Sequence, residues 1–170
     1  MKKTRFLTET AVCAAMATIL GFLKLFEMPQ GGSVSLAMVP ILFIAIKRGP
    51  VAGCACGVLY GIISVIFAGT IYHPASVFLD YILAFGALGV AGFFPKTTKG
   101  IALGSIAGVC GRFVFSVISG ATIFATYAPA GQNLWVYSII YQGTYMVPEL
   151  ILAIVVLVVL NAKAGRLFVD

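Results

Sequence analysis

The chain has 170 residues, of which 61% are hydrophobic and only 9% are charged. A soluble domain usually carries about 25% charged residues because its surface faces water. This composition therefore excludes an ordinary water-soluble domain and predicts a surface that faces lipid. The 11 basic and 5 acidic side chains leave a net positive charge, but the basic residues are neither clustered with aromatic residues nor gathered on one amphipathic helix. The charge therefore does not indicate nucleic-acid binding.

The first residues, "MKKTRFLTETAVCAAMATILGFL", have the basic-then-apolar order of a secretory signal. Their apolar run is too long for one, and no small-residue cleavage site follows it, so we expect a retained first helix. Further along, no Ser/Pro-rich linker, low-complexity tract or internal repeat divides the chain. We therefore expect residues 1–170 to form a single membrane-embedded domain.

A helix that crosses a bilayer needs about 20 apolar residues. Apolar segments of about this length predict an all-α membrane bundle of six helices over residues 5–26, 34–47, 51–69, 75–94, 100–126 and 134–161. The second segment is short. Its Pro40, together with the preceding Gly31 and Gly32, predicts a broken or tilted segment, which a membrane tolerates only where protein or a wet cavity satisfies the backbone.

The basic residues predict the orientation of the bundle, because cytoplasmic loops carry an excess of Lys and Arg. The loops between the predicted helices alternate between basic and nearly uncharged, and the uncharged set holds a single lysine, Lys24. We therefore expect both termini on the cytoplasmic side. The residues then assigned to that side are Lys2, Lys3, Arg5, Lys47, Arg48, Lys96, Lys99, Lys163 and Arg166.

Three ionisable residues fall inside the predicted spans: Asp80, Arg112 and Glu149. Each costs at least about 2.5 to 3.5 kcal/mol on insertion scales, so each requires a partner or a function. We expect an intramembrane ion pair between Arg112 and Glu149, with pairing of Arg112 to Asp80 left open as the alternative.

Polar residues share one face on each of the last two predicted helices. At about 100° of rotation per residue, an arc of the last helix holds polar and aromatic side chains, and a face of the helix before it holds a second polar set. We expect the two faces to meet inside the bundle. The first set is Tyr137, Ser138, Tyr141, Gln142, Tyr145 and Glu149, and the second is Arg112, Ser116 and Ser119.

These faces allow two interpretations. In the first, they only make structural contacts between helices. In the second, Asp80 and Tyr81 join Tyr141, Gln142 and Tyr145 to supply an anion, hydrogen-bond partners and ring faces together. That combination suits a flat, polar, cationic organic ligand, and we favour it.

Catalysis and metal binding have little support in the sequence. His73 precedes Pro74, where a role at the start of a helix is expected. Cys54 and Cys56 resemble a metal motif only weakly, since two helical residues two apart point in different directions, and the other two cysteines also lie in apolar runs. No hydrolase, protease or nucleotide-binding motif is present. We therefore expect no enzyme activity, no metal and no cofactor.

Four stretches together carry a family resemblance: "LTETAVCAAMATIL", "PQGGSVSLAMVPI", "HPASVFLDYILAFGALGVAG" and "ISGATIFATYAPAGQNLWVYSIIYQGTYMVP". They resemble the thiamine-specific substrate-binding subunits of energy-coupling factor transporters. The resemblance implies a multi-pass protein of a prokaryotic cell membrane that captures a vitamin on the extracellular side. It also implies assembly with a transmembrane coupling subunit and two cytoplasmic ATPases. Ala11 and Ala15 match the small-residue spacing with which such subunits dock on the coupling subunit.

The resemblance also assigns residues. The acidic residue of the family's LDY/LEY motif falls on Asp80, where a carboxylate would offset the thiazolium charge, and Tyr81 follows it. The helix-six tyrosine falls on Tyr137 and a pocket aromatic on Phe124, a smaller ring than the tryptophan of some members. The loop that acts as a lid in the family comprises Gln30, Gly31, Gly32, Ser33 and Ser35.

Two positions depart from the family pattern. Ser116 stands where members carry a histidine, and Gln142 where they carry an asparagine. These changes leave the ligand open between thiamine, which we favour, and a precursor pyrimidine or related heterocycle. The complete expected binding set is Asp80, Tyr81, Ser116, Phe124, Tyr137, Tyr141, Gln142, Tyr145 and Glu149. A small membrane enzyme or channel is the alternative of another class.

Overall fold

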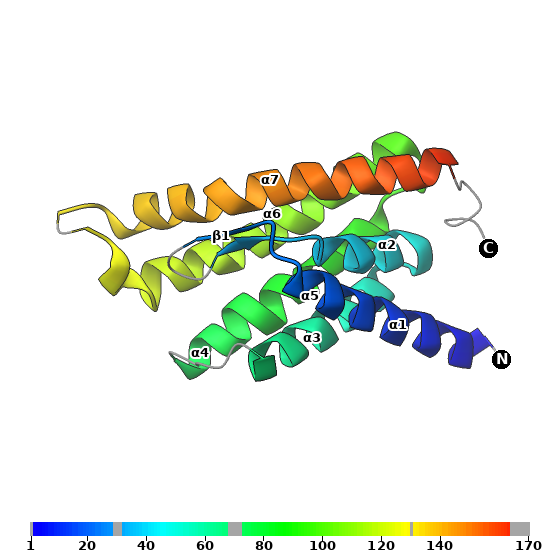
Figure 1. Ribbon diagram of the computed structural model, residues 1–170, viewed down its shortest axis with the longest axis horizontal. Coiled ribbons are helices and arrows are strands. Elements are labelled where there is room, and N and C mark those ends of the chain that lie inside the picture. The colour runs from blue at the N-terminus through cyan, green and yellow to red at the C-terminus, as the bar shows by residue number, and fades with distance from the viewer. Residues whose placement is uncertain (1, 29–31, 68–72, 130, 164–170) are drawn as a thin grey trace.

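The computed structural model describes residues 2–28, 32–67, 73–129 and 131–163. It is a bundle of helices with one very short hairpin (Figure 1). The long helices are α1 (Lys2–Phe22), α3 (Pro50–Phe67), α6 (Thr98–Thr122) and α7 (Leu134–Lys163), and α2 (Met38–Arg48) is shorter. A further continuous helical stretch consists of α4 (Pro74–Ser76), the π-helix η1 (Val77–Leu83), α5 (Ala84–Ala87) and the 3-10 helix η2 (Leu88–Phe93), and a short 3-10 turn, η3 (Ala125–Tyr127), follows α6.

The helices confirm the predicted bundle and most of its boundaries. Among the described residues, five stretches are long and apolar enough to span a membrane, and each overlaps a predicted span: Lys3–Phe22, Pro50–Phe67, Pro74–Phe93, Thr98–Thr122 and Leu134–Lys163. The remaining predicted segment, residues 34–47, corresponds to α2, whose 11 residues at about 1.5 Å per residue are too short to cross a bilayer alone.

A broken or tilted segment was predicted here, and α2 has no break at Pro40. Residues 34–37 are not helical, and α2 runs unbroken from Met38 to Arg48. Pro40 lies in its first turn, where the missing N–H removes no helical hydrogen bond. The segment is short because the helix begins late.

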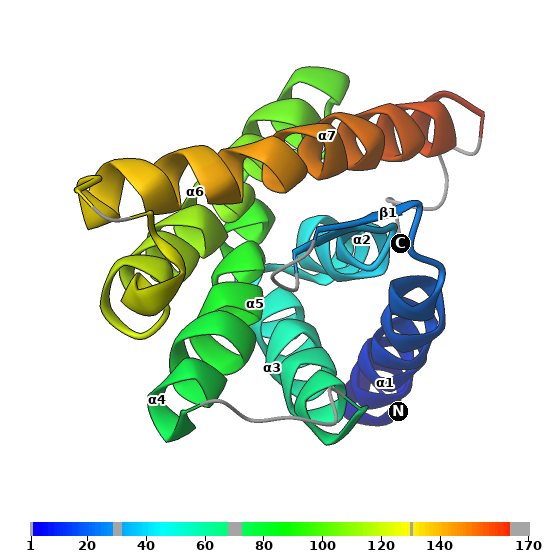
Figure 2. The same cartoon turned by 60° about the vertical axis from the view of Figure 1, so that its left-hand side comes forward.

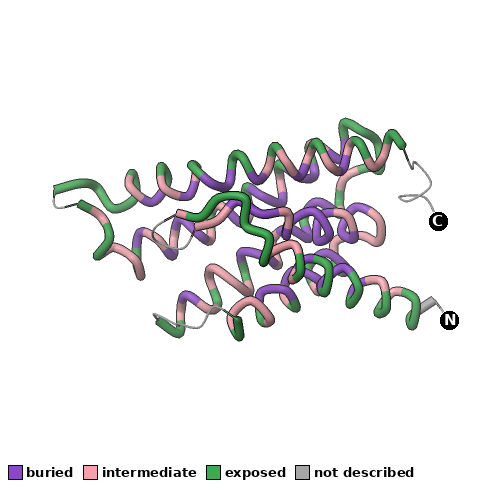
Figure 3. Tube along the Cα trace, viewed as in Figure 1, coloured by how far each residue is buried: buried purple, intermediate pink, exposed green. Residues whose placement is uncertain are grey.

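The helix α2 is mostly buried (Figure 3) and contacts α1, α3, η2, α6 and α7. Met38, Ile41, Leu42 and Ile44 are all fully buried, which satisfies the expectation that so short a segment must be enclosed.

By contrast, α7 has two faces. Val147, Ile151, Val155 and Val159 recur every four residues and are all exposed, as expected of a lipid-facing stripe.

Close contact between α3 and the α4–η2 stretch depends on glycine. Gly53, Gly57 and Gly61 recur every four residues on α3, so they share one face. A Cβ at Gly57 would collide with the backbone carbonyl of Phe85, and one at Gly61 with that of Tyr81. The two backbones therefore approach more closely than any side chain would permit. This packing fixes the position of Asp80 and Tyr81, which lie in η1.

The connection between α1 and α2, residues 23–37, contains an antiparallel hairpin that the all-α expectation missed. The strands β1 (Phe26–Glu27) and β2 (Ser33–Val34) pair Phe26 with Val34 and Glu27 with Ser33. The hairpin lies alongside α7 (Figure 2). We refer to its described residues, 23–28 and 32–37, as the lid, because they include the described part of the lid loop expected from the sequence.

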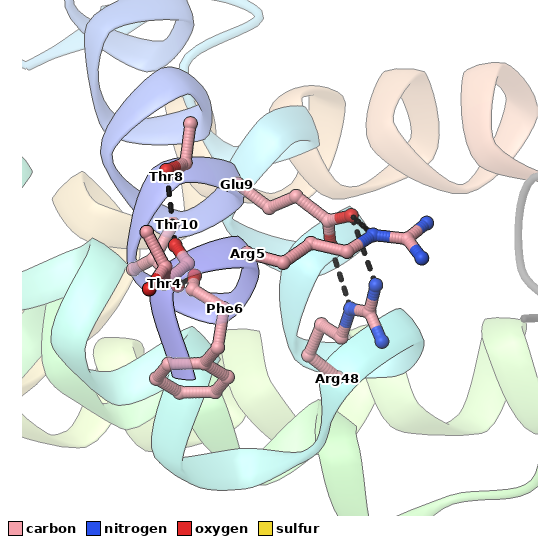
Figure 4. Close-up of polar contacts among 7 residues, drawn as sticks. All are labelled: Thr4, Arg5, Phe6, Thr8, Glu9, Thr10 and Arg48. Atoms are coloured by element: carbon pink, nitrogen blue, oxygen red, sulfur yellow. Dashed lines mark hydrogen bonds and ion pairs between the residues drawn. The ribbon is translucent and has the colours of Figure 1, made fainter. Parts of the chain in front are cut away.

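The first turns of α1 lie at the same end of the bundle as the end of α7 (Figure 1). There Glu9 accepts hydrogen bonds from Arg48 Nε at 2.6 Å and Nη2 at 2.9 Å, and from Arg5 Nε at 3.0 Å (Figure 4). These contacts join α1 to the end of α2. The basic residues at this end are among those predicted to face the cytoplasm, although Arg166 lies outside the described residues.

Candidate functional site

A cavity of about 470 Å³ opens between the lid and the helices, a size within the usual range for small-molecule sites. All nine residues expected to bind ligand line it. They come from three separate parts of the chain, η1, α6 with its C-terminal end, and α7: Asp80, Tyr81, Ser116, Phe124, Tyr137, Tyr141, Gln142, Tyr145 and Glu149. The cavity therefore brings together expected binding residues from 80 to 149, which lie up to 69 positions apart in sequence.

One wall of the cavity is the inward face of α7. Tyr137 and Tyr141 are stacked with ring centroids 6.1 Å apart, and Tyr141 meets Tyr145 edge-on at 6.2 Å. Ser138 and Gln142 are buried on the same face. The polar arc predicted from helical periodicity is therefore directed into the bundle, opposite the lipid-facing valines of the same helix.

Hydrogen bonds lock this wall to α6. Ser138 Oγ donates to the carbonyl of Val117 at 2.9 Å, and Gln142 Nε2 donates to the carbonyl of Ser116 at 3.1 Å. Tyr145 in turn donates its hydroxyl proton to Gln142 Oε1. The Gln142 amide is thus fixed on both sides, which leaves it one further N–H for a ligand.

The floor of the cavity is an ion pair. Arg112 Nη1 donates to Glu149 Oε2 at 2.9 Å, and both side chains are buried. This decides the question left open by the sequence, since Arg112 pairs with Glu149 and not with Asp80. The guanidinium also lies over the ring of Phe85, with Cζ 4.4 Å from the centroid, a favourable cation–π geometry.

Asp80 occupies a different environment. It lies half-buried on the π-helix η1, and Ser119 Oγ of α6 donates a hydrogen bond to its Oδ2. Within the described residues Asp80 makes no ion pair. π-helical turns occur frequently at functional sites, and this one places both Asp80 and Tyr81 on the cavity wall. The cavity therefore has a carboxylate without a cationic partner from the described protein.

The lid covers the cavity from the side of α7. Gly32, Ser33 and Ser35 of the expected lid loop line the cavity, whereas Gln30 and Gly31 lie outside the described residues. Gly32 sits so close to Tyr145 that a Cβ there would lie 2.6 Å from the ring. Glycine is therefore required at this point of the lid by the close approach of the ring.

Sequence reasoning missed the contribution of α1 and α3. Tyr60 and Ser64 of α3 and Gly21 of α1 also line the cavity. Tyr60 meets Phe85 edge-on at 4.6 Å, and a Cβ at Gly21 would lie 2.7 Å from the Tyr60 hydroxyl. Tyr60 and Ser64 are four residues apart on α3, and this spacing alone indicates a shared polar face on that helix.

Outside the cavity, the structure shows where His73 and the four cysteines lie. His73 caps the start of α4, with its Nδ1 accepting from the backbone N–H of Ala75 at 3.1 Å, so the expected helix-start role is confirmed. Cys13 and Cys56 are buried, while Cys54 and Cys110 are exposed on the bundle. No group of three metal-ligating side chains occurs in the part of the chain that the structure describes.

Comparison with known proteins decides the family. The sequence profile described as "Thiamine transporter protein" matches residues 7–169. The chain belongs to this thiamine transporter family. Among curated members, it is 39% identical to the thiamine transporter ThiT of Bacillus subtilis, over 95% of this chain and 92% of that protein. It is 30% identical to ThiT of Lacticaseibacillus paracasei, over 99% and 92% respectively.

Solved structures agree with the thiamine transporter fold. ThiT from Listeria monocytogenes superposes with a TM-score of 0.91 at 26% identity, covering 99% of each chain. A structure described as the S component of a bacterial ECF transporter superposes with a TM-score of 0.69 at 20% identity, again covering 99% of each chain. The membrane bundle expected from the sequence is therefore an established fold of this family, and its members place the chain in a bacterial cell membrane.

Proposed function

We propose that this chain is the substrate-capture subunit of an energy-coupling factor importer and that it binds thiamine from the extracellular side. The observation that carries the proposal is the Asp80 carboxylate, which faces a tyrosine-lined cavity without an ion-pair partner among the described residues. A carboxylate in a membrane is costly unless a charge offsets it. The thiazolium ring of thiamine supplies a permanent positive charge.

The rest of the cavity suits the same ligand. Tyr137, Tyr141 and Phe124 offer ring faces for two flat heterocycles, and a cation over an aromatic ring is attracted to it. Tyr81 and the free amide hydrogen of Gln142 supply hydrogen-bond partners for an aminopyrimidine. Relatives at 39% and 30% identity are named thiamine transporters, which supports thiamine over other vitamins.

A thiamine-precursor pyrimidine remains the alternative ligand. Ser116 replaces a histidine of the family pattern and supplies neither a cation nor a ring. The carbonyl of Ser116 already accepts a hydrogen bond from Gln142 Nε2. A neutral pyrimidine would use the hydrogen bonds of the site but not the charge of Asp80, so the two ligands are separable by experiment.

We further propose that the chain acts with a transmembrane coupling subunit and two cytoplasmic ATPases. The S-component likeness of the fold supports this assembly. Ala11 and Ala15 lie exposed on α1, where small residues allow another helix to approach closely. The curated relatives are named as transporters, which disfavours the alternative of a small membrane enzyme or channel.

Calorimetric titration of the purified chain with thiamine and with 4-amino-5-hydroxymethyl-2-methylpyrimidine tests the function. Thiamine is expected to bind at least about tenfold more tightly, a difference of about 1.4 kcal/mol. Equal or tighter binding of the pyrimidine would establish the alternative. Substrate turnover or ion conduction by the chain alone would instead replace the capture function altogether.

A further inference from the structure

Glu149 contacts the lid as well as Arg112. Its Oε1 accepts a hydrogen bond from Ser35 Oγ at 3.0 Å, while its Oε2 accepts from Arg112 Nη1 at 2.9 Å. All three side chains are buried, and Glu149 is only 2% exposed. The result is a chain of contacts from α6, through α7, to the last part of the lid.

Ser35 marks the junction between the lid and α2. Its Oγ also accepts from the backbone N–H of Ala37 at 3.3 Å, and Ala37 belongs to the central core cluster. The ion pair therefore holds the point at which the lid leaves the core.

The second half of the lid, residues 32–37, also contacts α7 before Ser35. Gly32 lies against Tyr145, Val34 packs in a cluster with Tyr145 and Met146, and Ser35 bonds to Glu149. These α7 positions lie about one helical turn apart, so successive lid residues follow one stripe of the helix. The same stripe faces the cavity.

The first half of the lid has less support of this kind, although Met28 packs against the same cluster of Val34, Tyr145 and Met146. Phe26 is 58% exposed, and the described backbone hydrogen bonds of this half to the second are those of the hairpin, including Leu25 N–H to Val34 O at 2.9 Å and Met28 N–H to Gly32 O at 2.6 Å. The hairpin hydrogen bonds therefore attach the first half to the second half, which is itself held against α7. Weakening the attachment of residues 32–37 to α7 would therefore loosen the whole lid.

We propose that Glu149, held in place by Arg112, is a positioning residue that fixes the base of the lid through Ser35 and so sets how long the ligand is retained. This inference rests on the proposed function, but it gives Glu149 a different role from a ligand contact. Both carboxylate oxygens are already engaged by protein donors. The charge of Glu149 is offset by Arg112, which leaves Asp80 as the carboxylate for the ligand cation.

The test removes the Ser35 link and leaves the buried ion pair intact. In Ser35→Ala, hydrogen exchange of the lid amides in residues 24–28 is measured first without ligand, by mass spectrometry of the detergent-purified chain. Dissociation rates of thiamine and of the neutral hydroxymethylpyrimidine are then measured by stopped-flow. Ser105→Ala is the matched control, because Ser105 is also buried but does not line the cavity, and its hydroxyl donates to the carbonyl of Ile101 within α6. Ser35→Thr, which keeps the hydroxyl, tests for rescue.

Ser35→Ala is expected to speed lid exchange and to speed dissociation of both ligands by the same factor, about tenfold, since the lost hydrogen bond involves a charged acceptor. Ser35→Thr should restore both rates, and Ser105→Ala should leave them near those of the parent. Unchanged exchange and dissociation in Ser35→Ala would overturn the proposal. So would faster dissociation of thiamine alone, because that would place the Glu149 charge on the ligand. If the parent binds no thiamine, the proposed function fails, and the exchange measurement still decides the role of Ser35.

Discussion

Ser119 donates a hydrogen bond to Oδ2 of Asp80 across the interface between α6 and the π-helix η1. Ser119 is fully buried, whereas Asp80 is half-buried on the cavity wall. One carboxylate oxygen is therefore held by protein while the other remains available to the cavity. Ser119 orients a short acidic side chain, so that its charge is presented in one direction.

Replacing Ser119 by alanine is expected to weaken thiamine binding about three- to tenfold, because one hydrogen bond to a charged group would be lost and Asp80 would gain rotational freedom. Ser105→Ala is the matched control. Ser105 is also fully buried on α6, but its hydroxyl bonds to the carbonyl of Ile101 within the same helix. Equal calorimetric affinities of Ser119→Ala and Ser105→Ala would contradict the orienting role.

The glycines of α3 offer a test of how the site is positioned. In Gly61→Ala the new Cβ would collide with the backbone carbonyl of Tyr81, so η1 must shift at a cost of about 1 to 3 kcal/mol. We expect both a lower unfolding temperature and a loss of thiamine affinity. Gly143→Ala on α7 should do neither, since a Cβ there meets nothing within 4 Å and alanine favours the helix by about 0.5 to 1 kcal/mol. Normal binding by a folded Gly61→Ala protein would count against this packing argument.

The buried ion pair predicts a strongly non-additive result. Glu149→Met leaves the Arg112 charge buried and should destabilise the protein by about 3 to 5 kcal/mol. The double variant Arg112→Met with Glu149→Met replaces both charges by apolar side chains of similar length and should recover most of that loss. Thermal unfolding in detergent measures both proteins. Additive losses would show that the two side chains are not coupled as the 2.9 Å contact implies.

Phe124 provides a prediction in the direction of tighter binding. Among the aromatic side chains, tryptophan attracts a cation over its ring most strongly, and Phe124 lines the cavity. Phe124→Trp should therefore improve thiamine affinity by about threefold or more, measured by competition against the parent. Phe78→Trp is the control, because Phe78 is 61% exposed on the outside of η1. A gain that is equal in both variants would show that the effect does not come from the cavity.

Much of the fold follows from the sequence by simple physical rules. The length of the apolar segments predicts the membrane spans. Gln142 and Glu149 lie on one face of α7 and Val147 and Val155 on the opposite face, which predicts that the polar face points into the bundle. The charges at Arg112 and Glu149 predict that each is neutralised, because neither is tolerated alone in the membrane. The sequence left Asp80 open as the partner of Arg112, and the structure decides for Glu149. These rules are local or require only that buried charges be neutralised.

Other features depend on tertiary packing that a single sequence does not disclose. Residues 77–83 form a π-helix that packs closely against Gly61 of α3, a contact between two segments that are distant in the sequence. The hairpin at Phe26 and Val34 is too short to give a periodic signal. The partnership of Ser35 with Glu149 spans 114 positions and could not be read from the spacing of either residue.

The charge of Asp80 provides the most direct test of the central claim. Asp80→Asn keeps the shape of the side chain and removes its charge, and two unit charges about 4 Å apart attract by about 4 kcal/mol even at an effective dielectric constant of 20. Titrations of the parent and the variant with thiamine and with the neutral hydroxymethylpyrimidine give four affinities. We predict that the variant loses at least about tenfold in thiamine affinity and changes by less than about threefold toward the pyrimidine. An Asp80→Asn protein that binds thiamine as tightly as the parent would contradict the account.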